Sequence, residues 1–432
     1  MRKFYFLVSV CLFISLGATA QNLLNRSALA KVGKTPLTSV PLKVAPLDAA
    51  ALSRAKAAQA GDNDQIITQQ PEGTLYHNAI RHAKGYLIEQ DGLSYYYEMD
   101  GIASDFVVAD DGSVYLKNPV IGLFTDSWVK GTKAQGDTVV MNFPQKVYTE
   151  TVNGQSYDVY ADRMVMTTAI GPNGQEMSTY EPDKANREVK FVWRNDTLRQ
   201  VDSVLVGLTL ASGQWLGAGD DVMDVTPMTY TVAAPQHPEN KKEYTLDYTS
   251  NGIAEQRTLY LVKEDNNVFL GNLLDELPNA WIKGKMDGNK MVFASDQYLG
   301  LYEEMFIHVF FNNAKVDKVW NPDFGEYSNV LTLDNSNPLT FSKDDVTGEY
   351  TSDGVLGINQ GHTISMFANA YQEMRLTPKE DTSVGNVTES TVEHVAYFDV
   401  TGRTVKPGFK GVVVKKTTFK DGKQLVEKLT RH

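Results

Sequence analysis

A tryptophan-led phrase that occurs twice is the feature that most restricts how this chain can fold. Residues 128–131 read Trp-Val-Lys-Gly, and residues 281–284 read Trp-Ile-Lys-Gly. The separation between matched positions drifts only from 154 residues at Val114 and Val268 to 153 at the tryptophans and 152 at the later glutamines. We infer two tandem copies of one module. The shared residues are Trp128, Lys130, Gly131, Gly136 and Gln145 in the first copy and Trp281, Lys283, Gly284, Gly288 and Gln297 in the second.

Turn signals and β-favouring residues dominate the body of the chain. Asp-Gly and Asn-Gly pairs, such as those at residues 111–112 and 287–288, separate runs rich in Tyr, Val and Ile. Such pairs between alternating apolar runs indicate β-hairpins, and long helical periodicity is nearly absent. The expected fold is all-β. It consists of two related antiparallel modules over residues 73–227 and 228–377, each a sandwich or a barrel.

The repeated tryptophans have two interpretations. Tryptophan is highly buried on average, which favours Trp128 and Trp281 packed under the sheet as a duplicated core position. Lys130 and Lys283 would then point outward, and the glycine after each lysine would permit the next turn. The alternative is a pair of exposed platforms for sugar rings, and full burial of both indoles would exclude it.

The N-terminus has the layout of a secretory signal. Two basic residues precede an apolar run over residues 4–16, and small residues follow up to Ala20. We therefore expect a signal peptide over residues 1–20, with cleavage before Gln21. The run is shorter than the about 20 residues that a helical span requires, so no membrane span is expected in the mature chain. Residues 21–72 are predicted to be a largely disordered linker, with room for a short Ala-rich helix.

Cysteine and charge restrict the function classes. The only cysteine, Cys11, lies in the signal-like run, so we expect neither a disulfide nor a thiolate nucleophile in the mature chain. Residues 21–400 carry 30 basic and 51 acidic residues, whereas residues 401–432 carry nine basic and two acidic ones. An acidic body lacks the basic face that nucleic-acid binding requires, and no nucleic-acid partner is expected.

The last segment has a pattern of its own, in which an aromatic residue, an Asp-x-x-Gly-Arg sequence and a glycine-led β-branched strand follow one another. The residues that carry it are Tyr397, Asp399, Gly402, Arg403 and Gly411. This pattern resembles the C-terminal sorting domain of Bacteroidetes proteins exported by the type IX (Por) secretion system. The resemblance implies a small β-sandwich over residues 394–432 behind a linker over residues 378–393, with the export machinery as its partner. The body is similar to secreted Bacteroides and Prevotella proteins of uncharacterised function that share the tryptophan-led phrase.

Catalytic and metal-binding motifs are not found. The seven histidines show no metal-ligand spacing, and no nucleophile elbow, Walker loop or Rossmann fingerprint occurs. We interpret His308 as buried and hydrogen-bonded. The acidic groups at residues 220–224, 264–267 and 343–345 are interpreted as surface turns, with calcium binding as a weaker alternative. No catalytic, cofactor-binding or metal-binding residue is assigned.

The expected function is that of a secreted or cell-surface protein that binds a partner or has a structural role without catalysis. A glycan or another surface protein would be its ligand. The alternative is a carbohydrate-active hydrolase with a carboxylate pair that is remote in sequence. A hydrolase should show a cleft with two carboxyl groups about 5–10 Å apart, whereas a binding protein should expose a strip of aromatic side chains.

Overall fold

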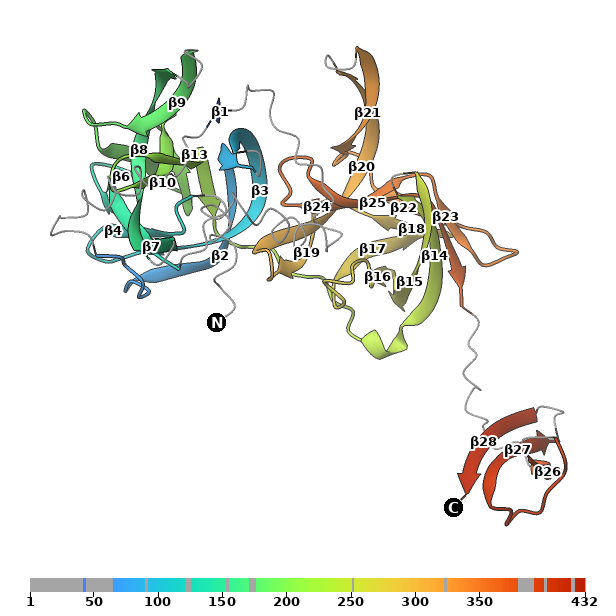
Figure 1. Cartoon of the computed structure of the whole chain (residues 1–432). Coiled ribbons are helices and arrows are strands. Elements are labelled where there is room, and N and C mark those ends of the chain that lie inside the picture. Colours follow the sequence, from blue (N-terminus) through green and yellow to red (C-terminus); the bar gives the residue numbers. More distant parts are fainter. Residues whose placement is uncertain are drawn as a thin grey trace. The chain divides into compact units, whose positions relative to one another are not determined.

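The regular secondary structure of the computed structural model is almost entirely β-strand, which confirms the expected fold class (Figure 1). Among the described residues, one short 3₁₀ helix occurs, at Pro238–Asn240. The chain divides into two compact units, one ending at Thr377 and the other beginning at Pro378. The structure describes residues 42–43, 65–89, 92–120, 126–152, 155–170, 176–250, 252–321, 325–379, 392–399, 402–420 and 424–431.

The first copy of the repeat is built on a closed ring of eight antiparallel strands. Each strand pairs with its neighbour, and the last strand pairs back with the first, so the sheet has no end. Closure protects the strand edges that an open sheet would expose. The ring order is β2 (Thr74–Ile88), β3 (Leu93–Val108), β4 (Ser113–Lys117), β5 (Trp128–Lys133), β6 (Thr138–Asn142), β10 (Glu188–Arg194), β11 (Thr197–Gln200) and β13 (Trp215–Thr226).

The second copy repeats this ring strand for strand. Its eight strands pair in the equivalent order and close in the same way, from the last strand back to the first. The ring order is β14 (Lys242–Ser250), β15 (Ile253–Glu264), β16 (Asn267–Gly271), β17 (Trp281–Asp287), β18 (Lys290–Phe293), β22 (Leu339–Lys343), β23 (Tyr350–Ser352) and β25 (Phe367–Pro378).

Four further strands in each copy form a side sheet that joins the ring through its last strand. In the first copy β8 pairs with β7, β9 and β12, and β12 pairs with β13. In the second, β20 pairs with β19, β21 and β24, and β24 pairs with β25. The two related antiparallel modules are thereby confirmed, and each is a barrel with a side sheet. The bounds are β7 (Gln145–Val152), β8 (Gln155–Ile170), β9 (Glu176–Pro182), β12 (Leu205–Leu210), β19 (Gln297–Tyr302), β20 (Ile307–Asn321), β21 (Glu326–Leu333) and β24 (Val355–Gln360).

Apolar side chains fill both rings. Because side chains alternate across a strand, one face of every ring strand contributes to the interior. In the first ring Phe106, Met141 and Phe191 are at most 1% exposed, and in the second Phe293 and Phe341 are fully buried. Each ring interior is therefore a packed core.

A buried ion pair interrupts the apolar core of the first ring. Arg81 of β2 contacts the carboxylate of Asp220 of β13, and both side chains are almost completely buried. The guanidinium also donates to the carbonyl oxygens of Asn118 and Pro119, at 2.7 and 2.8 Å. Burial lowers the pKa of Arg81, and the Asp220 carboxylate opposes that effect. The pair thus ties two ring strands to the segment after β4.

The C-terminal unit is a single antiparallel sheet of three strands. They are β26 (Val392–Asp399), β27 (Gly411–Phe419) and β28 (Gln424–Arg431), with β27 in the centre. The small β-domain expected at the C-terminus is therefore present as one layer in the described residues, without the second layer of a sandwich. Val413 and Phe419 of the central strand are its buried apolar side chains.

Candidate functional site

The repeated tryptophans occupy equivalent places and are buried. Trp128 begins β5 and Trp281 begins β17, and their side chains are 3% and 9% exposed. Neither indole can serve as an exposed platform for a sugar ring. Their immediate successors, Val129 and Ile282, belong to the ring cores, so the tryptophans themselves lie on the outer faces of the rings.

The segment that leads into each copy contacts its tryptophan residue. In the first copy the Trp128 N–H donates to the carbonyl oxygen of Ile67, at 2.9 Å. In the second copy Ala233 packs against a cluster formed by Trp281, Val262 and Phe269. The sequence had predicted that both indoles pack under the sheet. The structure instead places both indoles on the outer faces of the β-rings, where the leading segment bonds to the Trp128 backbone and packs against Trp281 through Ala233.

The repeated glutamines explain why the match extends beyond the phrase itself. Gln145 accepts from the Lys130 N–H at 2.7 Å, and it donates to the carbonyl oxygens of Lys130 and Asn142. Gln297 makes the same three bonds, to both backbone groups of Lys283 and to the carbonyl oxygen of Ala294. Each glutamine thus ties the first strand of the side sheet to the ring.

The lysines and glycines of the phrase also have structural roles. Lys130 lies over the ring of Tyr115, and Lys283 lies over Phe269 at the equivalent place, at 5.6 and 5.8 Å from the ring centroids. Gly131 pairs with the neighbouring strand, where a Cβ would meet the Met141 Cγ at 2.8 Å; Gly284 is similarly confined. This glycine was expected to permit a turn, but it is required for close strand packing. The turns lie later, at Gly136 and Gly288, where φ is +69° and +60°.

The acidic group at residues 220–224 is not a surface turn, because it lies within strand β13. Asp220 is inside the ring beside Arg81, and Asp221 accepts from the Tyr96 hydroxyl at 2.8 Å. Asp224 forms an ion pair with Arg199. Three neighbouring carboxylates are thus directed to three different partners, because a strand with a bulge at Asp220 does not keep them on one side.

His308 is buried, and both of its ring nitrogens are hydrogen-bonded, as the sequence indicates. Its Nε2–H donates to the Asn78 carbonyl oxygen at 2.8 Å, and its Nδ1 accepts from the Tyr298 hydroxyl at 2.9 Å. Burial lowers the pKa of His308 to about 4. Across the described residues, no group of three or more His, Cys, Asp or Glu side chains is arranged to hold a metal ion.

The sorting-like pattern forms a tight turn at the end of β26. The Arg403 N–H donates to the Asp399 carboxylate at 3.0 Å, and the Gly402 N–H donates to the Asp399 carbonyl oxygen. Gly402 has φ +85°, which favours glycine. Tyr397 lies in β26, and Gly411 begins β27. The expected cleavage residues, Ala20 and Gln21, lie outside the described residues.

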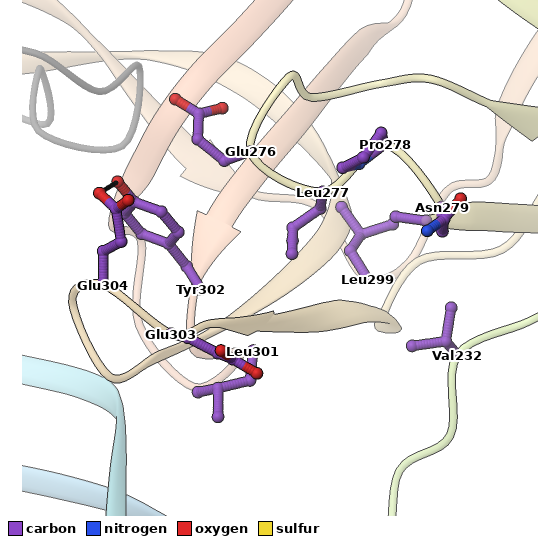
Figure 2. Close-up of a pocket in the computed structure, with 11 residues that line it drawn as sticks. Val232, Glu276, Leu277, Pro278, Asn279, Leu299, Leu301, Tyr302, Glu303 and Glu304 are labelled. Atoms are coloured by element: carbon purple, nitrogen blue, oxygen red, sulfur yellow. Dashed lines mark hydrogen bonds between the residues drawn. The ribbon is translucent and has the colours of Figure 1, made fainter.

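An open groove of about 790 Å³ lies on the second copy (Figure 2). Apolar side chains such as Leu277 and Leu299 line it, and Glu276, Glu303 and Glu304 bring three carboxylates to its wall. The Tyr302 hydroxyl donates to the Glu304 carboxylate at 3.1 Å. Within this groove, these three glutamates are the carboxylates that the hydrolase alternative would use.

Exposed aromatic side chains occur at a hairpin that sequence reasoning did not single out. Strands β20 and β21 continue beyond the side sheet and project from the second copy (Figure 1). Near the tip, Trp320 and Tyr327 are cross-strand partners, and their rings meet edge to face with centroids 5.3 Å apart. They are 52% and 67% exposed. A Trp beside an Asn-Pro-Asp turn sequence was the signal that could have located them.

The side chains around this pair give the hairpin an aromatic face with polar neighbours. Alternation places Val316 and Lys318 on the same face as Trp320, and Lys318 is directly opposite Asn329. The first copy carries the equivalent hairpin, β8–β9, with exposed Met166 and Ile170 at the positions of Val316 and Trp320. The aromatic pair is therefore specific to the second copy.

Comparison with protein-family models, with curated proteins and with solved structures found no match. No helix among the described residues has both the length and the apolar character needed to cross a membrane.

Proposed function

We propose that the protein is a noncatalytic binding protein, that the hairpin β20–β21 is its contact surface and that a glycan is its ligand. The observation that carries this proposal is the exposure of Trp320 and Tyr327 together at the end of a projecting hairpin. Isolated exposed apolar residues are ordinary, but an exposed aromatic cluster on a monomer commonly marks a contact surface.

The chemistry of the hairpin suits a sugar. An indole presents a flat apolar face to the C–H groups of a pyranose, while Tyr and Lys can donate hydrogen bonds to its hydroxyls. Lys318 and Asn329 form the next cross-strand pair on the same face as Trp320 and Tyr327, two pairs along the hairpin. A two-stranded arm with aromatic rings and polar groups on one face can therefore contact a saccharide without enclosing it.

A thermal-shift screen against plant, host and bacterial glycans would test the proposal. A ligand at 100 times its dissociation constant should stabilise the full chain by about 2.7 kcal/mol. The Trp320→Ala variant should bind the selected glycan at least about tenfold more weakly, a loss of about 1.4 kcal/mol. Because Trp320 is exposed, the free energy of unfolding of the Trp320→Ala variant should differ from that of the unmodified chain by no more than about 0.5 kcal/mol.

The first copy supplies a matched control. Ile170→Ala truncates the equivalent apolar position of the hairpin β8–β9 and should leave glycan binding unchanged. Equal affinities for the unmodified chain and Trp320→Ala would refute the hairpin as the site. Breakdown of the glycan would instead favour the hydrolase, and Glu276→Gln, Glu303→Gln and Glu304→Gln would then test the groove.

We further propose that the protein is exported and that the C-terminal unit is its address. The resemblance of residues 394–432 to type IX sorting domains supports this, as does the separation of that unit from the body at Pro378. Deletion of residues 394–432 should leave a folded body that is retained in the periplasm of the producing bacterium. Antibody labelling of intact cells measures surface display, and normal display of the truncated chain would contradict the assignment.

A further inference from the structure

Strand β3 carries a short added strand, β1 (Leu42–Lys43), at the start of one of its edges. One edge pairs with β2 over most of its length. The other edge pairs with β4 at Phe106–Val108, with β20 at Ile102 and with the short strand β1 at Leu93–Ser94. An edge of this kind is a template for strand addition, in which backbone hydrogen bonds hold an extended peptide.

The short strand β1 inserts its leucine among aromatic rings beside this edge. Leu42 is only 7% exposed, although it comes from far outside the ring in sequence. It pairs with Ser94 in antiparallel register, and Lys43 pairs with Leu93. We call the surrounding side chains the aromatic cradle. Its members are Tyr86, Tyr96, Met164, Tyr180, Leu205 and Trp215.

Contacts among the cradle side chains hold them in place independently of Leu42. The Tyr86 ring lies 5.0 Å from Tyr96, 5.5 Å from Tyr180 and 5.9 Å from Trp215, and Tyr180 and Trp215 are 5.2 Å apart. The Tyr96 hydroxyl donates to both Asp221 carboxylate oxygens, at 2.8 and 3.0 Å. The indole Nε1–H of Trp215 donates to the Ala218 carbonyl oxygen. A site whose walls are fixed in advance loses little conformational entropy on binding.

The second copy shows what this place looks like without an inserted leucine. Strand register matches Met164 with Ala314, Leu205 with Val355, Tyr180 with Leu331 and Trp215 with Phe367. The equivalent cluster there is closed by its own residues, which are mostly smaller; its members are Ala314, Leu331, Val355, Phe367 and Ala370.

The hairpin beside the cradle is also longer in the first copy. Strands β2 and β3 have 15 and 16 residues, whereas β14 and β15 have 9 and 12. The longer hairpin supplies Tyr86 and Tyr96 to the cradle, and it supplies the edge residues Leu93 and Ser94. The first copy therefore adds to the shared scaffold both an aromatic pocket and a strand edge next to it.

We propose that the aromatic cradle and the adjoining edge of β3 form a peptide-binding site. Its ligand is an extended segment that runs antiparallel to β3 and places a leucine-sized aliphatic side chain in the cradle. Leu42–Lys43 is an intramolecular occupant of this site, and a peptide of the same kind from another protein competes with it. Because a tethered segment acts at an effective concentration that reaches about 1 mM for short flexible linkers, the competing peptide binds well only after β1 is released.

The test uses the full chain and a fluorescently labelled peptide of residues 38–47. An aspartate at position 42 would bury a carboxylate among apolar rings and should release β1. Fluorescence anisotropy should show that the Leu42→Asp chain binds the peptide at least about tenfold more tightly than the unmodified chain does. Unlabelled peptide should compete, and a peptide with the same Leu42→Asp change should not.

Two further variants keep the outcome decisive. If Leu42→Asp does not fold, Leu42→Ala releases the same segment with less disturbance and should give an increase in the same direction. Adding Tyr180→Ala to the released chain should remove peptide binding, whereas adding Trp320→Ala should leave it unchanged, because the hairpin β20–β21 is a separate surface. Equal binding to released and unmodified chains, or no binding to either, would overturn the proposal.

Discussion

His308 makes the stability of this protein sensitive to acid at the scale of a single residue. Burial holds the pKa of His308 at about 4, against an ordinary value of 6.5. Between these values the unfolded chain takes up a proton at this site and the folded chain does not. The free energy of unfolding should therefore fall as the pH drops from about 6.5 to 4, by about 3 kcal/mol in total. His362 acts in the opposite sense, because Asp296 raises its pKa and its contribution is lost as the pH rises.

Urea unfolding of the full chain and of His308→Gln between pH 4 and pH 7 measures this effect. The variant should lose most of the slope below pH 6.5, whatever its stability at pH 7. Parallel pH profiles for the two proteins would show that other groups control the acid response.

At the scale of residues, the sequence predicted a buried, hydrogen-bonded histidine, because His308 lies among apolar residues. It could not predict Asn78 as a partner, since 230 positions separate the two residues.

Gly131, the last residue of the tryptophan-led phrase, and Gly136, in the turn that follows β5, should respond differently to substitution. The first lies in a strand and the second in a turn. Gly131 is inside β5, where a Cβ would approach the Met141 Cγ to 2.8 Å and the Val140 carbonyl oxygen to 3.1 Å. Gly131→Ala should therefore cost about 1–3 kcal/mol through overpacking. Gly136 has open space around it and φ +69°, so Gly136→Ala should cost about 1–2 kcal/mol through backbone strain alone.

Crystal structures or amide exchange of the two variants would separate the causes. Gly131→Ala should disturb protection in β5 and β6, whereas Gly136→Ala should affect only the turn. The same disturbance from both would contradict the assignment. At the scale of elements, Asp-Gly and Asn-Gly pairs were sufficient to predict hairpins. They could not reveal that β20 and β21 extend beyond their sheet, since strand length beyond a sheet edge depends on which neighbours pair with it.

At the scale of the molecule, Asp100 couples the two copies. Its buried carboxylate accepts from the His362 N–H, the Thr363 N–H and the Thr363 hydroxyl, all at 2.7–2.8 Å. Asp100 belongs to the first copy, and both partners belong to the second. Asp100→Ala leaves these donors unpaired and should cost about 3 kcal/mol. In calorimetry the body should then unfold in two transitions, one for each copy, instead of together.

An exposed turn residue provides the comparison, and Asp110→Ala should keep the unfolding pattern of the unmodified chain. One transition in both variants would mean that the other contacts between the copies, such as the His308–Asn78 hydrogen bond, are sufficient to couple them. The duplication could be predicted from the sequence because Trp128 and Trp281 keep almost the same spacing from their matched neighbours. The closure of the rings could not be predicted from the sequence. It depends on the pairing of β2 with β13, and nearly all the other strands of the copy lie between these two in the chain.

Ring closure determines the order in which the parts of this protein can fold during synthesis on the ribosome. Of the ring strands of the first copy, β2 emerges first, yet its final partner β13 is complete only when Thr226 has been made. A nascent chain that stops among the intervening strands would present unpaired edges to proteases and to other chains. All ring partners of the first copy precede Lys242, so that ring can close while the second is still being translated. Translation thus delivers two finished rings in succession, and each has one vulnerable interval, just before its last strand appears.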